Sequence, residues 1–272
     1  MDAIDVISIL FPTVSPEMCG KCLGAIFNSN YTDFEVIVDN VAGDSEVRRK
    51  IEEFGVREIN GTLSRLRSRL SLINEARGEK ILLLDDTRVI SKQLLGLLSN
   101  SNAPMVAIAE KEMGNGLISL VYNLEKKGLQ RLDPIRMDPI ALKSVIPRAY
   151  DSGLLKKASQ KIQSNIGSNI TDQLNTLDLE LLYFQAFQES RKVDYFPTPE
   201  IFHFAEGSFA ELWGKYFKYG MGQRLLEHTC YNLVSSMYGR TRKGLPISSR
   251  LLSLPALLLR SVPYILGYAH GS

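Results

Sequence analysis

The chain has 272 residues, of which 44% are hydrophobic and 23% are charged, so it can bury one large core or a domain with an appendage. A formal net charge of +2 gives no reason to expect a nucleic acid as partner. Three cysteines, Cys19, Cys22 and Cys230, argue against a disulfide framework and for a reducing compartment. Asp2 and Asp5 stand where a signal peptide has basic residues, so we expect a cytoplasmic protein.

The first forty residues predict a pair of parallel strands joined by a helix. Val6 to Phe11 is apolar enough for a buried strand that ends at Pro12, and Ser15-Pro16 is typical of a helix start. A second strand is expected from Phe34 to Val38. Strand, helix and strand in this order form a βαβ unit, so we predict an α/β fold with a mostly parallel sheet and helices on both faces.

Cys19 and Cys22 fall inside the first predicted helix. Their C-x-x-C spacing occurs in zinc half-sites and redox pairs, but the chain has no second C-x-x-C to complete a four-ligand site. A three-residue separation on a helix also places two small apolar side chains on one face. We favour this second interpretation.

A basic amphipathic helix is predicted from Thr62 to Arg77, because its apolar residues recur every three or four positions. Its other faces carry Arg65, Arg67 and Arg69. Arginines in such a run usually face solvent. The more specific alternative is that one of them contacts a phosphate group.

Two adjacent carboxylates follow the most apolar strand of the chain. Ile81 to Leu84 is an unbroken apolar run, and Asp85, Asp86 and Thr87 come directly after it. In open α/β sheets, ligands bind outside the carboxyl ends of such strands. Two neighbouring carboxylates repel each other, so a divalent cation that carries phosphates would suit them. A polar turn with an aspartate cap is the alternative.

The middle of the chain has weaker signals. Strands are expected around Leu117 to Tyr122 and Ile140 to Val145, and the polar, glycine-containing segment Gly153 to Ser168 is expected to be mobile and near a site. A helix from Leu174 to Ser190 and a strand from Val193 to Phe204 complete the predicted domain.

A helical extension follows. Ser208 and Glu211 have the spacing of a capping box, and Gly220 and Gly222 are expected to bend or break the helix that they follow. Leu251 to Ala269 is mostly apolar, but two prolines and a central arginine make a transmembrane span unfavourable. An interfacial helix on a membrane is one alternative, and a tail that packs on its own domain or on a second subunit is the other, with equal weight.

Four stretches in this order resemble the family 2 glycosyltransferases of the GT-A fold, which are inverting enzymes that use nucleotide-sugars. Val6 to Thr13 is similar to the first strand of that family, and Phe34 to Asn40 is similar to the second. Arg69 stands at the family's spacing before Ala76-Arg77-Gly78-Glu79, and Gly78 to Ser91 is similar to the strand that leads into the metal motif.

The resemblance implies roles for individual residues. Leu177 to Leu181 aligns with the helix that supplies the catalytic base, which maps onto Asp178. Mg²⁺ or Mn²⁺ is the implied cofactor, with Asp85, Asp86 and His203 as its ligands. The implied nucleotide-binding residues are Pro12, Thr13, Asp39, Arg69 and Asp85.

The resemblance covers about the first 205 residues, so the chain divides into a catalytic domain, residues 1–206, and a C-terminal helical extension, residues 207–272. It implies inverting transfer of a hexose from a UDP- or GDP-linked donor to an acceptor hydroxyl. The apolar tail, where it lies on a membrane, suggests a lipid-linked acceptor and a place on the cytosolic face. Thr87 in place of a third acid and Leu177 in place of the acid before the base motivate an alternative, an impaired nucleotide-binding relative, and residues 207–272 motivate another, a membrane-surface scaffold.

Overall fold

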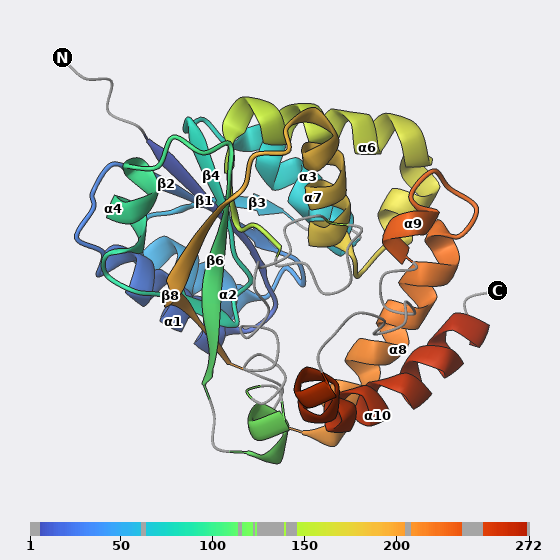
Figure 1. Cartoon of the computed structure of the whole chain (residues 1–272). Coiled ribbons are helices and arrows are strands. Elements are labelled where there is room, and N and C mark those ends of the chain that lie inside the picture. The colour runs from blue at the N-terminus through green and yellow to red at the C-terminus, as the bar shows by residue number, and fades with distance from the viewer. Residues whose placement is uncertain are drawn as a thin grey trace.

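A computed structural model describes residues 6–60, 64–113, 116–121, 123, 139, 146–204, 208–235 and 247–270. Eight strands form one sheet in the order β3-β2-β1-β4-β7-β6-β8-β5. The sheet lies between two groups of helices, and the C-terminal helices gather at one side of the molecule (Figure 1). The α/β architecture is the predicted one.

The elements have the following bounds. The strands are β1 (Ile7–Thr13), β2 (Phe34–Asn40), β3 (Arg57–Asn60), β4 (Lys80–Leu83), β5 (Arg88–Ile90), β6 (Met105–Met113), β7 (Ala149–Asp151) and β8 (Asp194–Phe204). The helices labelled in Figure 1 are α1 (Pro16–Phe27), α2 (Ser45–Glu53), α3 (Arg65–Glu75), α4 (Leu94–Ser99), α6 (Ser152–Gln173), α7 (Asp178–Glu189), α8 (Phe209–Leu226), α9 (Asn232–Ser235) and α10 (Ile247–His270).

The sheet is parallel in its first half and mixed in its second. β1 pairs in parallel with β2 and β4, and β2 pairs in parallel with β3. β7 runs antiparallel to both β4 and β6, and β5 runs antiparallel to β8. The carboxyl ends of β1, β2 and β4 therefore meet at one edge, which is where ligands bind in sheets of this kind.

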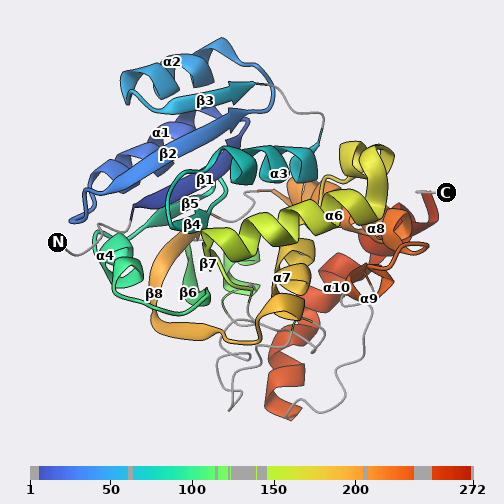
Figure 2. The same cartoon turned by 90° about the horizontal axis from the view of Figure 1, so that it is seen from above.

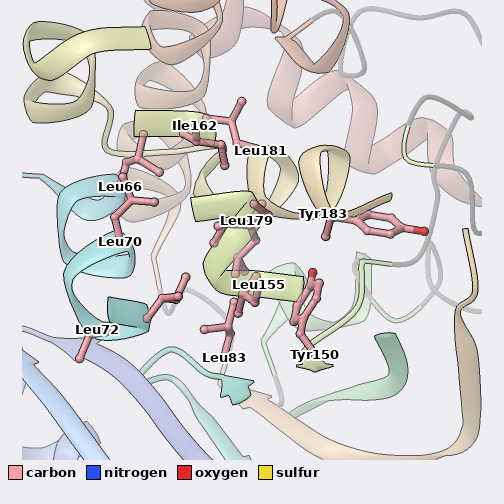
Figure 3. Close-up of a cluster of buried hydrophobic side chains, with 14 of the residues drawn as sticks. Leu66, Leu70, Leu72, Leu83, Tyr150, Leu155, Ile162, Leu179, Leu181 and Tyr183 are labelled. Carbon is pink, nitrogen blue, oxygen red and sulfur yellow. The ribbon is translucent and has the colours of Figure 1, made fainter. Parts of the chain in front are cut away.

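Helices bury an apolar core on each face of the sheet. On one face α3, α6 and α7 enclose Leu70, Leu155 and Leu181 among others (Figure 3). On the opposite face α1, α2 and α4 cover a second cluster, which includes both Cys19 and Cys22. Both thiols are fully buried, and burial raises the pKa of Cys19 to about 11. The two cysteines are core residues, as the favoured interpretation expects.

The C-terminal helices pack closely on one another. Ser208 and Glu211 form the predicted capping box of α8. α10 lies along α8, away from α1 and α2 (Figure 2). Within the described part of the chain, none of the helices combines the length and apolar character that crossing a bilayer requires.

Two sequence expectations for the middle of the chain are wrong. Residues 117–121 are helical, whereas a strand was predicted there. The segment expected to be mobile, Gly153 to Ser168, lies within α6, whose buried residues include Leu155 and Ile162. The strand expected around Ile140 to Val145 lies outside the described residues.

The glycines of α8 do not break the helix, although the sequence predicted a bend or break at Gly220 and Gly222. They allow neighbouring segments to pack closely on α8. α8 continues through Gly220 and Gly222. A Cβ atom on Gly220 would lie 2.1 Å from the carbonyl oxygen of Tyr264 in α10, and one on Gly267 would lie 1.9 Å from the carbonyl oxygen of Phe217. The two helices thus approach so closely that only hydrogen fits at these positions.

Gly220→Ala should therefore destabilise the packing of α10 on α8 by about 1–3 kcal/mol, because the added methyl meets backbone atoms that cannot rotate away. Gly214→Ala in the same helix is the matched control: no atom lies within 4 Å of its Cβ position, so it should be neutral or stabilise by up to about 1 kcal/mol. Urea unfolding followed by the fluorescence of Trp213, the only tryptophan, measures both changes. Equal stabilities for the two variants would contradict the close packing.

Candidate functional site

A cleft of about 880 Å³ opens at the carboxyl ends of the central strands. Pro12, Thr13 and Val14 at the end of β1 line it, as do Asp85 and Asp86 after β4. The sheet thus provides one wall from residues that the sequence placed at strand ends. The remaining lining residues come from the loop after β2, α3, the end of α6 and α8: Val41, Arg65, Asp172, Gln173, Asn175, Lys218, Met221, Gly222 and Leu225.

Asp85 lies at the base of this cleft, is only 5% exposed, and is surrounded by arginines. Arg65 and Arg69 of α3 both donate to its Oδ1 atom, and Arg88 donates to its Oδ2 atom. A fourth guanidinium, that of Arg148, lies 3.7 Å from Oδ2. One carboxylate is therefore shared by four cations.

Asp178 belongs to the same cluster. Arg69 Nε donates to Asp178 Oδ2 at 3.0 Å, and Arg65 Nε lies 2.9 Å from Asp178 Oδ1. The preceding residue, Leu177, has a left-handed backbone (φ 63°), a conformation in which a non-glycine residue is strained. This turn begins α7 and presents Asp178 to α3, so both carboxylate oxygens of the predicted base face arginines.

Burial and the arginines act in opposite directions on the two carboxylates. Burial alone would raise the pKa of Asp85, but Arg65, Arg69, Arg88 and Arg148 outweigh it and hold the pKa well below its usual range. The pKa of Asp178 is likewise lowered, because the guanidinium groups outweigh its burial. Both side chains are therefore ionised at neutral pH.

Asp86 has a different environment. Its Oδ2 atom accepts a hydrogen bond of 2.9 Å from the Thr13 hydroxyl and one of 3.2 Å from the Val14 amide. Burial raises the pKa of Asp86, and these two hydrogen bonds oppose the rise. Asp86 thus fastens the end of β1 to the end of β4.

The residues predicted to bind Mg²⁺ or Mn²⁺ do not form a ligand set as they are arranged. Both oxygens of Asp85 already contact guanidinium groups. His203 Nδ1 lies 2.7 Å from Glu112 Oε2, and burial lowers the pKa of His203. No group of three or more acidic, histidine or cysteine side chains suited to a metal occurs in the described part of the chain. These residues therefore do not fit the implied metal.

The other predicted site residues lie around the cleft without lining it. Asp39 is fully buried and faces Pro12 across the β1–β2 pair. Arg69 is also fully buried, beneath the lining residue Arg65. Of the predicted residues, Pro12, Thr13, Asp85 and Asp86 line the cleft, whereas Asp39, Arg69, Asp178 and His203 do not.

Comparison with solved structures shows which proteins share this arrangement. Neither the models of protein families nor the curated proteins give a match to the sequence. S. aureus TarS 1–349, a glycosyltransferase, superposes with a TM-score of 0.57 at 12% identity, over 96% of this chain and 88% of that chain. The chain has the GT-A fold.

Two further structures with a similar fold contain ligands. TarS 1–349 in complex with UDP-GlcNAc has a TM-score of 0.57 at 12% identity, over 92% of this chain and 79% of that chain. The mannosyltransferase PcManGT from Pyrobaculum calidifontis, in complex with GDP-Man and Mn²⁺, has a TM-score of 0.54 at 12% identity, over 97% of this chain and 73% of that chain. Assignment of the chain to family 2 stays a prediction.

Sequence reasoning missed two cations of the cleft. Arg65 lies one helical turn before Arg69, and this i, i+4 spacing places both on one face of α3, so it was a signal for a pair. Lys218 lies off the apolar stripe of α8, and it lines the cleft from an exposed position. Arg88 and Arg148 carry no comparable signal, because only the folded sheet brings them to Asp85.

The arginine cluster predicts how stability depends on pH. A carboxylate whose pKa is lowered by folding stabilises the fold above its unfolded pKa of 3.8, and this contribution is lost as pH falls through the folded value. The free energy of unfolding of the wild type should therefore fall steeply below about pH 4. Asp85→Asn should be less stable at pH 7 and show a shallower fall.

Urea unfolding from pH 7 to pH 2.5 measures both curves. Asp33→Asn is the control, because Asp33 is exposed and lies outside the arginine cluster. Parallel curves for Asp85→Asn and the wild type would show that the ion pairs of Asp85 do not stabilise the fold.

Proposed function

We propose that the chain transfers a sugar from a nucleoside-diphosphate donor to an acceptor hydroxyl. The observation that carries this proposal is the cleft at the carboxyl ends of β1, β2 and β4, in a fold shared with enzymes that bind UDP-GlcNAc and GDP-Man. Its volume of about 880 Å³ is in the range of small-molecule sites.

In this proposal the donor lies along the wall formed by the strand ends. Pro12 and Thr13 contact the nucleoside, with Asp39 behind them at the end of β2. Asp85 holds the arginines in place rather than contacting the donor. The proposed reaction is inverting: the acceptor oxygen attacks the anomeric carbon, the bond from that carbon to the diphosphate breaks, and the nucleoside diphosphate leaves with the electron pair.

Asp178 is the proposed base that receives the acceptor proton. Two observations support this role of Asp178: the side chain is ionised, and it contacts Arg65, which lines the cleft. In the unliganded arrangement Arg65 and Arg69 engage both carboxylate oxygens and lower the pKa, which weakens Asp178 as a base. We therefore expect Arg65 to shift toward the donor and free one oxygen when the donor binds.

A panel of UDP- and GDP-sugars tests the proposal. A cognate donor at one hundred times its dissociation constant should stabilise the fold by about 2.7 kcal/mol and raise the melting temperature. With acceptor present, or slowly with water, the nucleoside diphosphate should be released. A panel in which no nucleotide-sugar stabilises the chain would contradict the proposal.

Asp178→Asn should abolish release of the nucleoside diphosphate while the donor still stabilises the fold. The variant should also unfold more easily, by roughly 1–3 kcal/mol, because buried Arg69 loses an ionised partner. Asp151→Asn is the matched control: it makes the same substitution at the N-cap of α6, away from the cleft lining, where asparagine caps about as well as aspartate, so it should keep both turnover and stability. Turnover by Asp178→Asn would show that another group is the base.

We further propose that the outer face of α10 rests on a membrane surface, where a lipid-linked acceptor would be presented. One side of α10 packs on α8, and the opposite side exposes large apolar residues at helical spacing. Ile118 of the helical segment 117–121 packs beside α8 and α10, and its neighbours Leu117 and Leu120 are exposed. The exposed residues of α10 are Leu254, Leu257, Leu258, Val262, Ile265 and Leu266.

Co-sedimentation with anionic lipid vesicles should pellet the wild-type chain. The double variant Leu258→Glu, Ile265→Glu should stay in the supernatant, because both side chains are more than half exposed and would carry charge into the lipid. Leu97→Glu on α4 is the control and should pellet. Equal pelleting of all three, or dimerisation through α10 instead, would contradict a membrane contact.

A further inference from the structure

We infer that this chain binds the diphosphate of its donor through Arg65 and Lys218, without a divalent cation. The inference rests on the proposed function and specifies how its cleft recognises the donor. It departs from the expectation of Mg²⁺ or Mn²⁺, because the residues that would hold the metal have other partners.

A metal in this cleft would need the Asp85 carboxylate, which is already occupied. A divalent cation at Asp85 would have to displace at least one guanidinium group from each oxygen that it used. Arg69 and Arg148 are buried and cannot swing into solvent. Arg69 would keep its contact with Asp178, and Arg148 would keep its contact with Glu110, but each would lose a charge-assisted contact with Asp85 that the metal would have to offset.

The neighbouring Asp86 and His203 are poor ligands for a metal as they are placed. Asp86 retains one oxygen beyond its contacts with Thr13 and Val14, and a single carboxylate oxygen is a weak site for a hard cation that prefers six or more oxygen ligands. His203 is held by Glu112 and does not line the cleft.

The net charge around the cleft favours an anion over a cation. Four guanidinium groups, from Arg65, Arg69, Arg88 and Arg148, are balanced by the four carboxylates of Asp85, Asp86, Asp178 and Glu110, and Asp172 is paired with Arg67. Lys218 therefore adds the one positive charge in excess among these cleft residues. A divalent cation would enter against this charge, whereas a diphosphate would be attracted by it.

One arginine of the cluster, Arg65, can reach a ligand in the cleft. Arg65 is the most exposed arginine of the cluster, at 38% of its side chain, and it lines the cleft. Its contacts with Asp85 and Asp178 use Nη2 and Nε, so within the described residues Nη1 is left to donate to a ligand. A guanidinium fork matches phosphate oxygens in geometry as well as in charge.

Lys218 supplies a second positive charge from a different element of the cleft. It extends from α8 into the lining of the cleft, and its ammonium group forms no ion pair with any carboxylate of the described residues. The two cations come from separate elements, α3 and α8, and line the same cleft. Together they would neutralise the charge that develops on the departing diphosphate.

The test is calorimetric titration of the full chain with UDP and with GDP, after removal of metal and in the presence of EDTA, and again with Mn²⁺. We expect one nucleotide to bind with the same dissociation constant in both conditions. Arg65→Gln and Lys218→Gln should each weaken that binding in EDTA, by roughly tenfold for Arg65, because each removes a charge-assisted contact.

The control variants are Arg57→Gln, whose arginine pairs with Glu35 and Glu75 at the other end of α3, and Lys192→Gln on an exposed loop. Both should bind as the wild type does. The melting temperature of Arg65→Gln separates lost binding from lost folding, and Lys218→Gln, at an exposed position, should melt as the wild type does.

The outcomes separate the inference from the proposed function. Binding that requires Mn²⁺ and disappears in EDTA would overturn the inference while leaving nucleotide recognition intact. Binding in EDTA that is unaffected by both substitutions would also overturn it. Failure of UDP and GDP to bind under either condition would overturn the proposed function and the inference together.

Discussion

The ion pairs of buried Asp85 are the constraint on which the cleft depends. Its arginine partners come from α3, from β5 and from the segment before β7, so one side chain joins elements that lie far apart in the sequence. Asp178 extends the network to α7. Removing one partner of such a cluster leaves the others as uncompensated buried charges. The cluster therefore places α3 and α7 relative to the ends of the strands.

The location of the site could be predicted from the sequence, whereas its chemistry could not. Strand ends are visible as apolar runs that stop at polar residues, and the parallel fold brings these ends to one edge. Asp85 and Asp86 were therefore expected in the cleft, and they line it. What a carboxylate binds depends on residues such as Arg148, which lies more than sixty positions away and meets Asp85 only after β4 has paired with β7.

Two physical effects account for the errors in the predicted fold: helical periodicity within a polar stretch, and close packing between two helices. The serine- and glycine-containing stretch within α6 has the polar character of a loop, yet Leu155, Ile162 and Ile166 recur at helical spacing and form a narrow buried stripe. The glycines of α8 were expected to break the helix, because glycine has a low helix propensity. Their lack of a side chain instead permits the contact with α10, an effect that only the partner helix reveals.

α8 links the two surfaces to which function is assigned. On one side it lines the cleft with Lys218 and Gly222, and a Cβ atom on Gly222 would lie 2.3 Å from the hydroxyl of Thr176. On another side Gly220 fixes the position of α10. A boundary at residue 206, predicted from the sequence, thus separates two segments that build one cleft.

Because close contacts join α10 to α8, which carries Lys218, a membrane that favours one position of α10 would also favour one shape of the cleft. Reciprocity then requires that a bound donor strengthen the membrane contact by the same factor.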